Sequence, residues 1–526
     1  MKPDKLPKSI SQQLVAVAVV SLLFVFFSLF FLHKHNNINF DFGKQVRSGQ
    51  FIVQHKQALN SNDFSFTDTD LKSINGQWSS SIVFYYVHSM GGLSGLTVLA
   101  LLLNLVSFFL IFKLSIHRSN YWLVVFLSLL VLPLLTFSTS PNTEMFSLLF
   151  FTISIFLIFN CAFSDSKHAY WWFLPIIQLL WVNFDSLFLI GLFLQLLLLL
   201  HLIINRRSKK DTLTFLIIFV ISIIACFFNP YGIDGFLLPM KSLIEINPQN
   251  ENLHFLFLYN RLGGSFYFFY FELLFFLSAL LLYYWLKNWK LVKPNFFIIV
   301  LFITTVLLIF WRINTAMYFA YVFIIMAVYI GKQFNSKLVK RTSIILTGLL
   351  LFSVVVFQIY FYLPYKTVNP GTGIENNLSG GANYFLKHQL HGPIFNTPEM
   401  GAYLTYYLFP KEQVFADNNA YADGFMGDVI TPALEDQRSW LDLDNKYNFN
   451  VVCLNYDNQS KDFTQRLLMD SRWFLAYNDS YCVIFLKRNK VNDPLVRKEL
   501  LDKLSLAEMM NRFSKSDFNF PYQGSK

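Results

Sequence analysis

Long apolar runs, separated by polar or basic segments, fill the chain up to about residue 363. A helix needs about 20 apolar residues to cross a hydrocarbon core of about 30 Å, and its backbone groups must bond within the segment. We therefore expect about eleven membrane-spanning helices. They cover residues 12–33, 92–113, 121–138, 144–163, 169–183, 186–205, 212–228, 266–286, 295–311, 315–331 and 343–363.

Basic residues set the expected orientation of these spans. Lys and Arg gather in every second connection, as in the cluster at 206–210, and are almost absent from the short connections between. Because basic loops stay in the cytoplasm, the N-terminus should be cytoplasmic and the segment after the last span should lie outside. The net charge of +10 lies mostly in these inner loops, so it gives no reason to expect nucleic acid as a partner.

Two outside connections are long, at residues 34–80 and 229–265. The first contains FGKQVRSGQFIVQHK and WSSSIVFYYVHSM, which have the apolar face of helices lying at the membrane interface. Residues 1–363 therefore form an expected membrane domain whose outside loops wall a cavity at the membrane surface.

The remainder of the chain is polar. After a linker at 364–377, residues 378–488 alternate helical patterns with the strand patterns PIFN, QVFAD, VVCLNY, FLAYND and YCVIFLKR. This order predicts a small α/β sandwich with a mainly parallel sheet, in which FLAYND and YCVIFLKR form a terminal hairpin. Residues 489–526 predict an amphipathic helix, at 493–513, and a tail.

The four cysteines show no spacing typical of metal sites. Cys161 and Cys226 fall in expected spans. Cys453 and Cys482 fall in strand patterns, where either buried thiols or, in an oxidising compartment, a disulfide would fit.

Charged residues in the outside connections are the candidate chemistry, because charges near lipid are costly. Asp41 follows the first span, Glu144 begins the fourth, Asp185 lies between the fifth and sixth, and Arg312 lies at the outer end of the ninth. A carboxylate accepts the proton of a hydroxyl or holds a divalent metal, whereas arginine grips a lipid phosphate. Structural roles fit as well: Glu144 and Asp185 as helix caps, and Arg312 as a headgroup anchor.

The order of the outside motifs resembles that of bacterial GT-C glycosyltransferases, which use polyprenyl-phosphate sugars and are related to dolichyl-phosphate-mannose protein mannosyltransferases and oligosaccharyltransferases. The resemblance spans residues 35–488. It is carried by DFGKQVRSGQFI, NGQWSSSIVFYYVHSMGGLSGL, SPNTEMFSLLF, WVNFDSLFLIGL, FFNPYGIDGFLLP and WRINTAMYF, in that order.

The resemblance implies roles for particular residues. Asp41 and Glu144 match the two catalytic acids and are also the implied ligands of Mg²⁺ or Mn²⁺. The chain departs from the family at Gln45 and Asp185, where relatives often have His, and at Asn419, where they often have Arg. These changes either retune binding or mark an inactive chain. The implied substrate-binding residues are Gln45, Gln77, Trp78, Asn183, Asp185, Asn229, Tyr231 and Arg312.

The implied activity is that of an inverting glycosyltransferase of a bacterial inner membrane. It would move a sugar or oligosaccharide from a polyprenyl-(di)phosphate carrier to a hydroxyl of a protein, lipid or glycan at the periplasmic face, among membrane lipids. Two other classes stay open: a flippase of lipid-linked sugar, and a non-catalytic assembly subunit. The spans lack the paired interrupted helices that alternating access tends to leave in a sequence.

Overall fold

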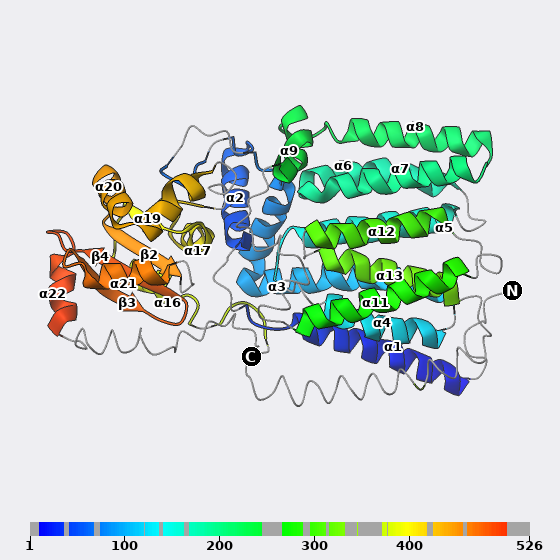
Figure 1. Cartoon of the computed structure of the whole chain (residues 1–526), viewed down its shortest axis with the longest axis horizontal. Helices are drawn as coiled ribbons and strands as arrows, with labels where there is room; N and C mark the ends of the chain where they lie inside the picture. Colours follow the sequence, from blue (N-terminus) through cyan, green and yellow to red (C-terminus); the bar gives the residue numbers. More distant parts are fainter. Residues whose placement is uncertain are drawn as a thin grey trace.

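The computed structural model describes residues 10–35, 41–60, 62–67, 74–119, 121–135, 140–162, 168–244, 266–287, 295–311, 315–331, 345, 371–375, 377–417, 424–455 and 460–501. Its apolar part forms a bundle of roughly aligned helices (Figure 1). Each expected span up to residue 331 overlaps one or two helices of this bundle. The helices are α1 Ile10–Phe31, α3 Trp78–Ile116, α4 Tyr121–Leu135, α5 Glu144–Ala162, η1 His168–Phe173, α6 Leu174–Phe184, η2 Ser186–Phe188, α7 Leu189–Ile204, α8 Lys209–Ala225, α11 Phe266–Lys287, α12 Phe296–Trp311 and α13 Ala316–Gly331.

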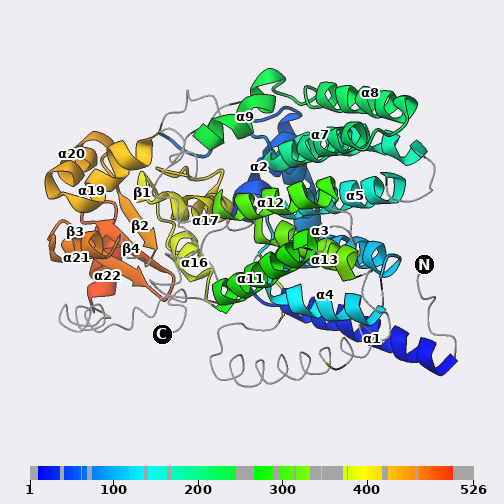
Figure 2. The same ribbon diagram turned by 45° about the vertical axis from the view of Figure 1, so that its right-hand side comes forward.

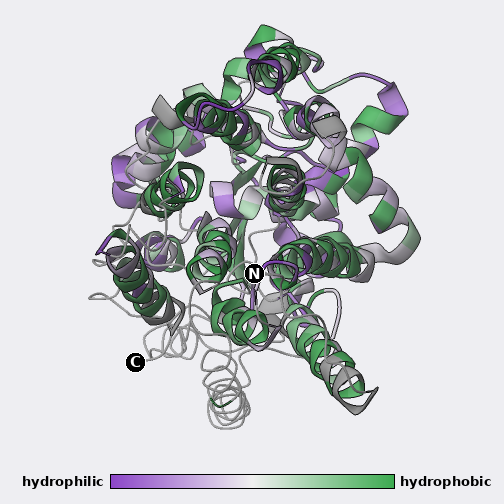
Figure 3. Cartoon of the chain, turned by 90° about the vertical axis from the view of Figure 1, so that its right-hand side faces the viewer, coloured by the Kyte–Doolittle hydropathy of each residue, from purple (hydrophilic) through white to green (hydrophobic). Residues whose placement is uncertain are grey.

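The bundle has the apolar exterior of a membrane domain, and Figure 3, which looks along it, shows its helices largely hydrophobic. Among the described residues, Trp78–Ile116 and Ser186–Ile204 are each long and apolar enough to cross a membrane, and five shorter apolar helices accompany them. Of the expected span at 343–363, only residue 345 is described.

Helix α13 forms the centre of the bundle. Nearly all of its side chains are buried, and α3, α4, α11 and α12 pack around it. Tyr318 meets Phe151 edge to face with ring centres 4.9 Å apart, and Phe319 lies 5.4 Å from Phe271. Because lipid is as apolar as these side chains, such close packing is what holds membrane helices together.

The first outside loop folds as expected, into helices at one end of the bundle. Helix α2, Asp41–His55, packs along the beginning of α3. Helix α3 kinks at Gly92, whose φ of +57° is a conformation that glycine adopts without strain. The residues before the kink are the predicted interfacial helix, and those after it are the predicted span. We call this end, where α2 and α9 (Ile233–Ile244) lie, the outer end of the bundle.

The C-terminal domain is an α/β sandwich at the outer end, but its sheet is not mainly parallel as expected. Strands β1 and β2 pair in parallel, whereas β2–β4 and β3–β4 are antiparallel, in the order β1-β2-β4-β3. A tight turn at Asp479 joins β3 to β4, which confirms the expected terminal hairpin. The departure is that β4 pairs antiparallel with β2 and so lies between β2 and β3. The elements are α16 Gly380–Lys387, β1 Ile394–Asn396, α17 Pro398–Leu408, η6 Met426–Ile430, α19 Thr431–Glu435, α20 Gln437–Tyr447, β2 Val451–Asn455, α21 Lys461–Met469, β3 Trp473–Asn478, β4 Cys482–Lys487 and α22 Asp493–Leu501.

Two further expectations for this domain concern QVFAD and the cysteines. The QVFAD segment is not a strand of the sheet, because its Val414 pairs instead with Ser65 of the first outside loop. Cys453 and Cys482 are buried free thiols. The amphipathic helix expected at 493–513 is seen as α22, and the residues after 501 lie outside the described part.

Three backbone or helix contacts join the C-terminal domain to the bundle. The segment 371–375 follows the end of α1, with the Gly373 carbonyl accepting from His35 N at 2.7 Å. The loop at 64–67 pairs with Val414, and α17 packs on α2. Figure 2 shows α16 and α17 between the sheet and the bundle. Helix α2 and the loop at 64–67 thus lie between the two domains.

Candidate active site

The sequence places Asp41 at the first turn of α2, where a carboxylate favours the positive end of the helix dipole. Its side chain is exposed, so a substrate has access to it. Gln45 lies four residues later and therefore on the same face of α2. The structure thus puts these two predicted site residues one helical turn apart.

Helices α2 and α3 cross in very close contact at Gly49. A Cβ placed on Gly49 would overlap the carbonyl oxygen of Ser81 and lie 2.8 Å from Cβ of Tyr85. This closeness allows the Ser81 hydroxyl to donate to Oε1 of Gln45 at 2.5 Å. Nε2 of Gln45 in turn donates to Oε1 of Gln77, the residue before α3, at 2.5 Å.

Asp185 is the buried hub of the site, with a side chain only 1% exposed. Its Oδ1 accepts from Gln77 Nε2 at 3.2 Å and from Thr143 Oγ1 at 2.9 Å. Its Oδ2 accepts from Ser147 Oγ at 2.6 Å and from the backbone N–H of Leu187 at 3.2 Å. The last bond caps η2, which confirms the helix-cap interpretation of Asp185. Through these four hydrogen bonds, the carboxylate holds α3, α5 and η2 together.

Glu144 is the first residue of α5 and is buried, 7% exposed. Its neighbour Thr143 reaches Asp185, so the start of α5 meets the α6–α7 turn. The helix N-terminus stabilises its negative charge. Whether it acts on a substrate stays a prediction.

Four other predicted residues form a second polar group beside α9. Nε1 of Trp78 donates to Oδ1 of Asn183 at 2.8 Å, and Nδ2 of Asn183 donates to the Phe228 carbonyl at 3.0 Å. Asn229 accepts from the backbone of Tyr231 at 2.9 Å, and the Tyr231 hydroxyl donates to the Leu59 carbonyl at 2.7 Å. These bonds shape the turn before α9, and a substrate-binding role for them stays a prediction.

Two predicted positions lie outside the described residues: Arg312 and Asn419. Sequence reasoning in turn missed Thr143, Ser147 and Ser81. The signal was present for the first two, since polar residues four apart at the start of an apolar helix share one face.

A divalent metal would have limited protein ligands here. Within the described ranges, no three His, Cys, Asp or Glu residues stand close enough to hold one. Asp185 does not fit as a ligand, because its oxygens already accept four hydrogen bonds. Asp41 and Glu144 remain the predicted ligands, which suits Mg²⁺, since this ion often uses one or two carboxylates with substrate phosphates and water.

A cluster that the sequence did not reveal joins α2, α3 and α17. Arg47 donates from Nε to the Tyr406 carbonyl at 2.8 Å, and its guanidinium lies 5.7 Å from the centre of the Tyr406 ring. Nε2 of His88 is 2.8 Å from the Tyr406 hydroxyl. Burial, and then the charge of Arg47, lower the pKa of His88. Nearby, Lys44 forms an ion pair with the buried Asp417 at 2.9 Å.

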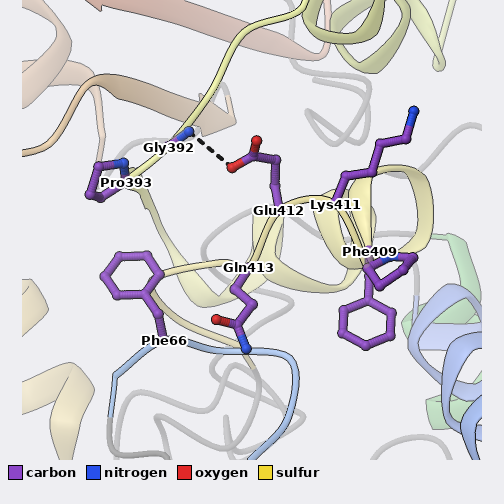
Figure 4. Close-up of a pocket in the computed structure, with 8 residues that line it drawn as sticks. Phe66, Gly392, Pro393, Phe409, Lys411, Glu412 and Gln413 are labelled. Carbon is purple, nitrogen blue, oxygen red and sulfur yellow. Dashed lines mark hydrogen bonds between the residues drawn. The ribbon is translucent and has the colours of Figure 1, made fainter.

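A hollow of about 490 Å³ opens on the surface of the C-terminal domain (Figure 4). Phe66 of the first outside loop, Phe409 and Glu412 line it, and Glu412 accepts from Gly392 N at 3.0 Å. It contains none of the predicted site residues.

Comparison with known proteins was made by sequence and by structure. No protein-family model matches the sequence, and neither does any curated protein. The structure is similar to the oligosaccharyltransferase of Archaeoglobus fulgidus in its apo form, with a TM-score of 0.59 at 10% identity, over 85% of this chain and 70% of that one.

Two ligand-bound structures are also similar. The A. fulgidus enzyme AglB, in complex with an inhibitory peptide and a dolichol-phosphate, gives a TM-score of 0.56 at 10% identity, over 85% of this chain and 70% of that one. ArnT from Cupriavidus metallidurans, bound to undecaprenyl phosphate, gives 0.50 at 13% identity, over 90% of this chain and 97% of that one. The chain therefore has the GT-C fold of membrane glycosyltransferases, as the order of its outside motifs predicts.

Proposed function

We propose that the protein is an inverting glycosyltransferase that moves a sugar or oligosaccharide from a polyprenyl-phosphate or polyprenyl-diphosphate carrier to an acceptor hydroxyl. The observation that carries this proposal is the placement of Asp41 and Glu144 at the starts of α2 and α5, at the outer end of a GT-C fold. Structures similar to this one hold dolichol-phosphate and undecaprenyl phosphate. The reaction would take place at the periplasmic face of a bacterial inner membrane.

The exposed Asp41 carboxylate would act as the general base. It accepts the proton of the acceptor hydroxyl while the hydroxyl oxygen attacks the anomeric carbon and the bond from that carbon to the carrier phosphate breaks. The phosphate leaves with the electron pair, and a single displacement inverts the anomeric centre.

The other acid and the arginine would act beside this base. Glu144 would orient the acceptor or share a Mg²⁺ or Mn²⁺ ion with Asp41, and such an ion would neutralise charge on the leaving phosphate. Arg312 would hold that phosphate through its two-pronged guanidinium. A protein Ser or Thr, a lipid and a glycan all offer the required hydroxyl.

A transfer assay with protein in nanodiscs tests the proposal. Synthetic polyprenyl-phosphate-linked sugars are supplied with candidate acceptors, and release of the carrier phosphate is measured. Asp41→Asn changes one heavy atom and should reduce turnover by about 10²-fold or more, the usual contribution of a general base. Asp462→Asn, at an exposed site on α21, is the matched control and should leave turnover unchanged.

Two results would redirect the proposal. Turnover of Asp41→Asn within about threefold of wild type would assign Asp41 a structural role. Movement of the lipid-linked sugar across a vesicle membrane without phosphate release would identify a flippase.

A further inference from the structure

Asp185 controls the direction of a chain of hydrogen bonds that reaches α2. A carboxylate accepts hydrogen bonds and has none to donate. Gln77 must therefore turn its amide nitrogen toward Asp185, at 3.2 Å. The amide oxygen of Gln77 then faces the other way, toward Gln45.

The same logic fixes the next amide. Because Gln77 presents an oxygen, Gln45 must present its nitrogen, at 2.5 Å, and its own oxygen is left to accept from the Ser81 hydroxyl, at 2.5 Å. We call Ser81, Gln45, Gln77 and Asp185 the amide relay. The orientation of an amide on α2 is thus set by a carboxylate on the far side of α3.

Each glutamine of the relay keeps one amide hydrogen that is available to a ligand. A side-chain amide nitrogen carries two hydrogens, and the bonds within the relay use one on each glutamine. Both glutamines are partly exposed, unlike Asp185. Gln45 also lies on the face of α2 that begins with Asp41.

We propose that Asp185 is a positioning residue, which touches no substrate but orients Gln45 and Gln77 so that their second N–H groups bind an uncharged oxygen of the acceptor. This inference rests on the proposed function. An acceptor hydroxyl or carbonyl fits better than the carrier phosphate, because the Asp185 carboxylate beside Gln77 would repel an anion and the phosphate is assigned to Arg312.

Asp185→Asn tests the proposal through the direction of the relay. The backbone N–H of Leu187 cannot turn away, so the new side chain must keep its oxygen there and offer its nitrogen to Gln77. Two donors then meet, and both glutamines must turn over. The number of hydrogen bonds stays the same while the amides reverse.

The expected result is a change in acceptor recognition without a loss of folding. The KM for the acceptor should rise about tenfold, as when a hydrogen bond to a ligand is lost, while the KM for the donor stays within about twofold. The thermal unfolding midpoint should stay close to that of wild type. Asp462→Asn again serves as the control, because this exposed residue lies on α21, outside the relay.

Gln77→Glu provides the diagnostic second variant. As a single change, Gln77→Glu places two carboxylates next to each other, so this variant should have a lower unfolding midpoint than Asp185→Asn. When it is combined with Asp185→Asn, the new carboxylate at position 77 accepts from the new amide and from Gln45, which restores the original direction of Gln45. The double variant should therefore regain much of the lost midpoint and have a lower acceptor KM than Asp185→Asn.

Each of the following outcomes would contradict one part of the proposal. The relay would be overturned if the double variant had an unfolding midpoint as low as that of the less stable single variant and an acceptor KM as high as that of the weaker-binding one. An unchanged acceptor KM in Asp185→Asn, or equal rises for donor and acceptor, would overturn the positioning role. If wild type transfers no sugar, the proposed function fails, and the substrate role fails with it; the relay is then still judged by the unfolding midpoints, which need no activity.

Discussion

Replacing Gly49 by alanine should push α2, the helix that carries Asp41 and Gln45, away from α3. A Cβ at this position would overlap the Ser81 carbonyl oxygen and lie 2.5 Å from the Ser81 carbonyl carbon, where ordinary contact begins at 3.4 Å. Both obstructing atoms belong to the backbone of α3, so no side chain can rotate out of the way. Helix α2 must move by more than about 1 Å to restore an ordinary contact distance to that oxygen.

The magnitude follows from overpacking and from lost hydrogen bonds. An added methyl group in a well-packed contact costs about 1–3 kcal/mol. A shift of α2 also weakens the bonds from Gln45 to Gln77 and Ser81, each with a net value of about 1 kcal/mol. We expect Gly49→Ala to lower the free energy of unfolding by about 3 kcal/mol.

Gly91→Ala is the matched control on the same pair of helices. A Cβ there meets nothing within 4 Å, and alanine is the better helix former. Thermal unfolding in detergent micelles should show a lower midpoint for Gly49→Ala and an unchanged or higher one for Gly91→Ala, with transfer activity lost only in the first. Equal midpoints for the two variants would refute the close crossing of α2 and α3.

Three further predictions concern the domain junction and the donor. Since the pKa of His88 is lowered from 6.5, its neutral form stabilises the fold above that pH, and stability should fall as the pH drops through the lowered pKa. His88→Asn should remove this part of the pH dependence of the unfolding midpoint. If the midpoints of wild type and variant changed with pH in the same way, the role of His88 would be contradicted. Lys44→Met removes the ammonium group 2.9 Å from the buried Asp417 carboxylate and should cost about 3 kcal/mol, whereas adding Asp417→Leu should recover most of it; an equally unstable double variant would argue against the pair. Arg312→Ala should raise the donor KM about tenfold or more, and Arg312→Lys less, with the acceptor KM nearly unchanged; unaltered donor saturation would leave Arg312 as a headgroup anchor.

Local sequence rules predicted the elements that depend on local chemistry. Apolar runs of spanning length located the bundle, and the alternation of basic loops kept the spans on either side of Asp185 apart. An acid directly before a helix can accept from a backbone N–H of its first turn, as Asp185 does from Leu187. The same rule recognised Asp185 as a cap. What it could not supply was the partner from α3, because the bond to Gln77 joins residues 108 apart.

The errors have a related cause. A strand pattern is the same for parallel and antiparallel pairing, so VVCLNY and YCVIFLKR did not reveal that β4 would insert between β2 and β3. QVFAD reads as a strand, yet Val414 found its partner in Ser65, far back in the membrane domain. The Arg47–Tyr406 contact was equally invisible, since neither residue stands out without the other.

The position of α2 between the bundle and the C-terminal domain has a consequence for biosynthesis. Arg47 bonds to Tyr406, 359 residues later in the chain. At a synthesis rate of about 5–20 residues per second, α2 emerges roughly 20–70 s before α17 exists to cover it. During that interval its docking face, with Lys44 and Arg47, has only water or another protein as a neighbour. Completion of the outer end must therefore wait for synthesis of the last quarter of the chain, and a ribosome that stalls before residue 400 would leave α2 without α17 to cover it.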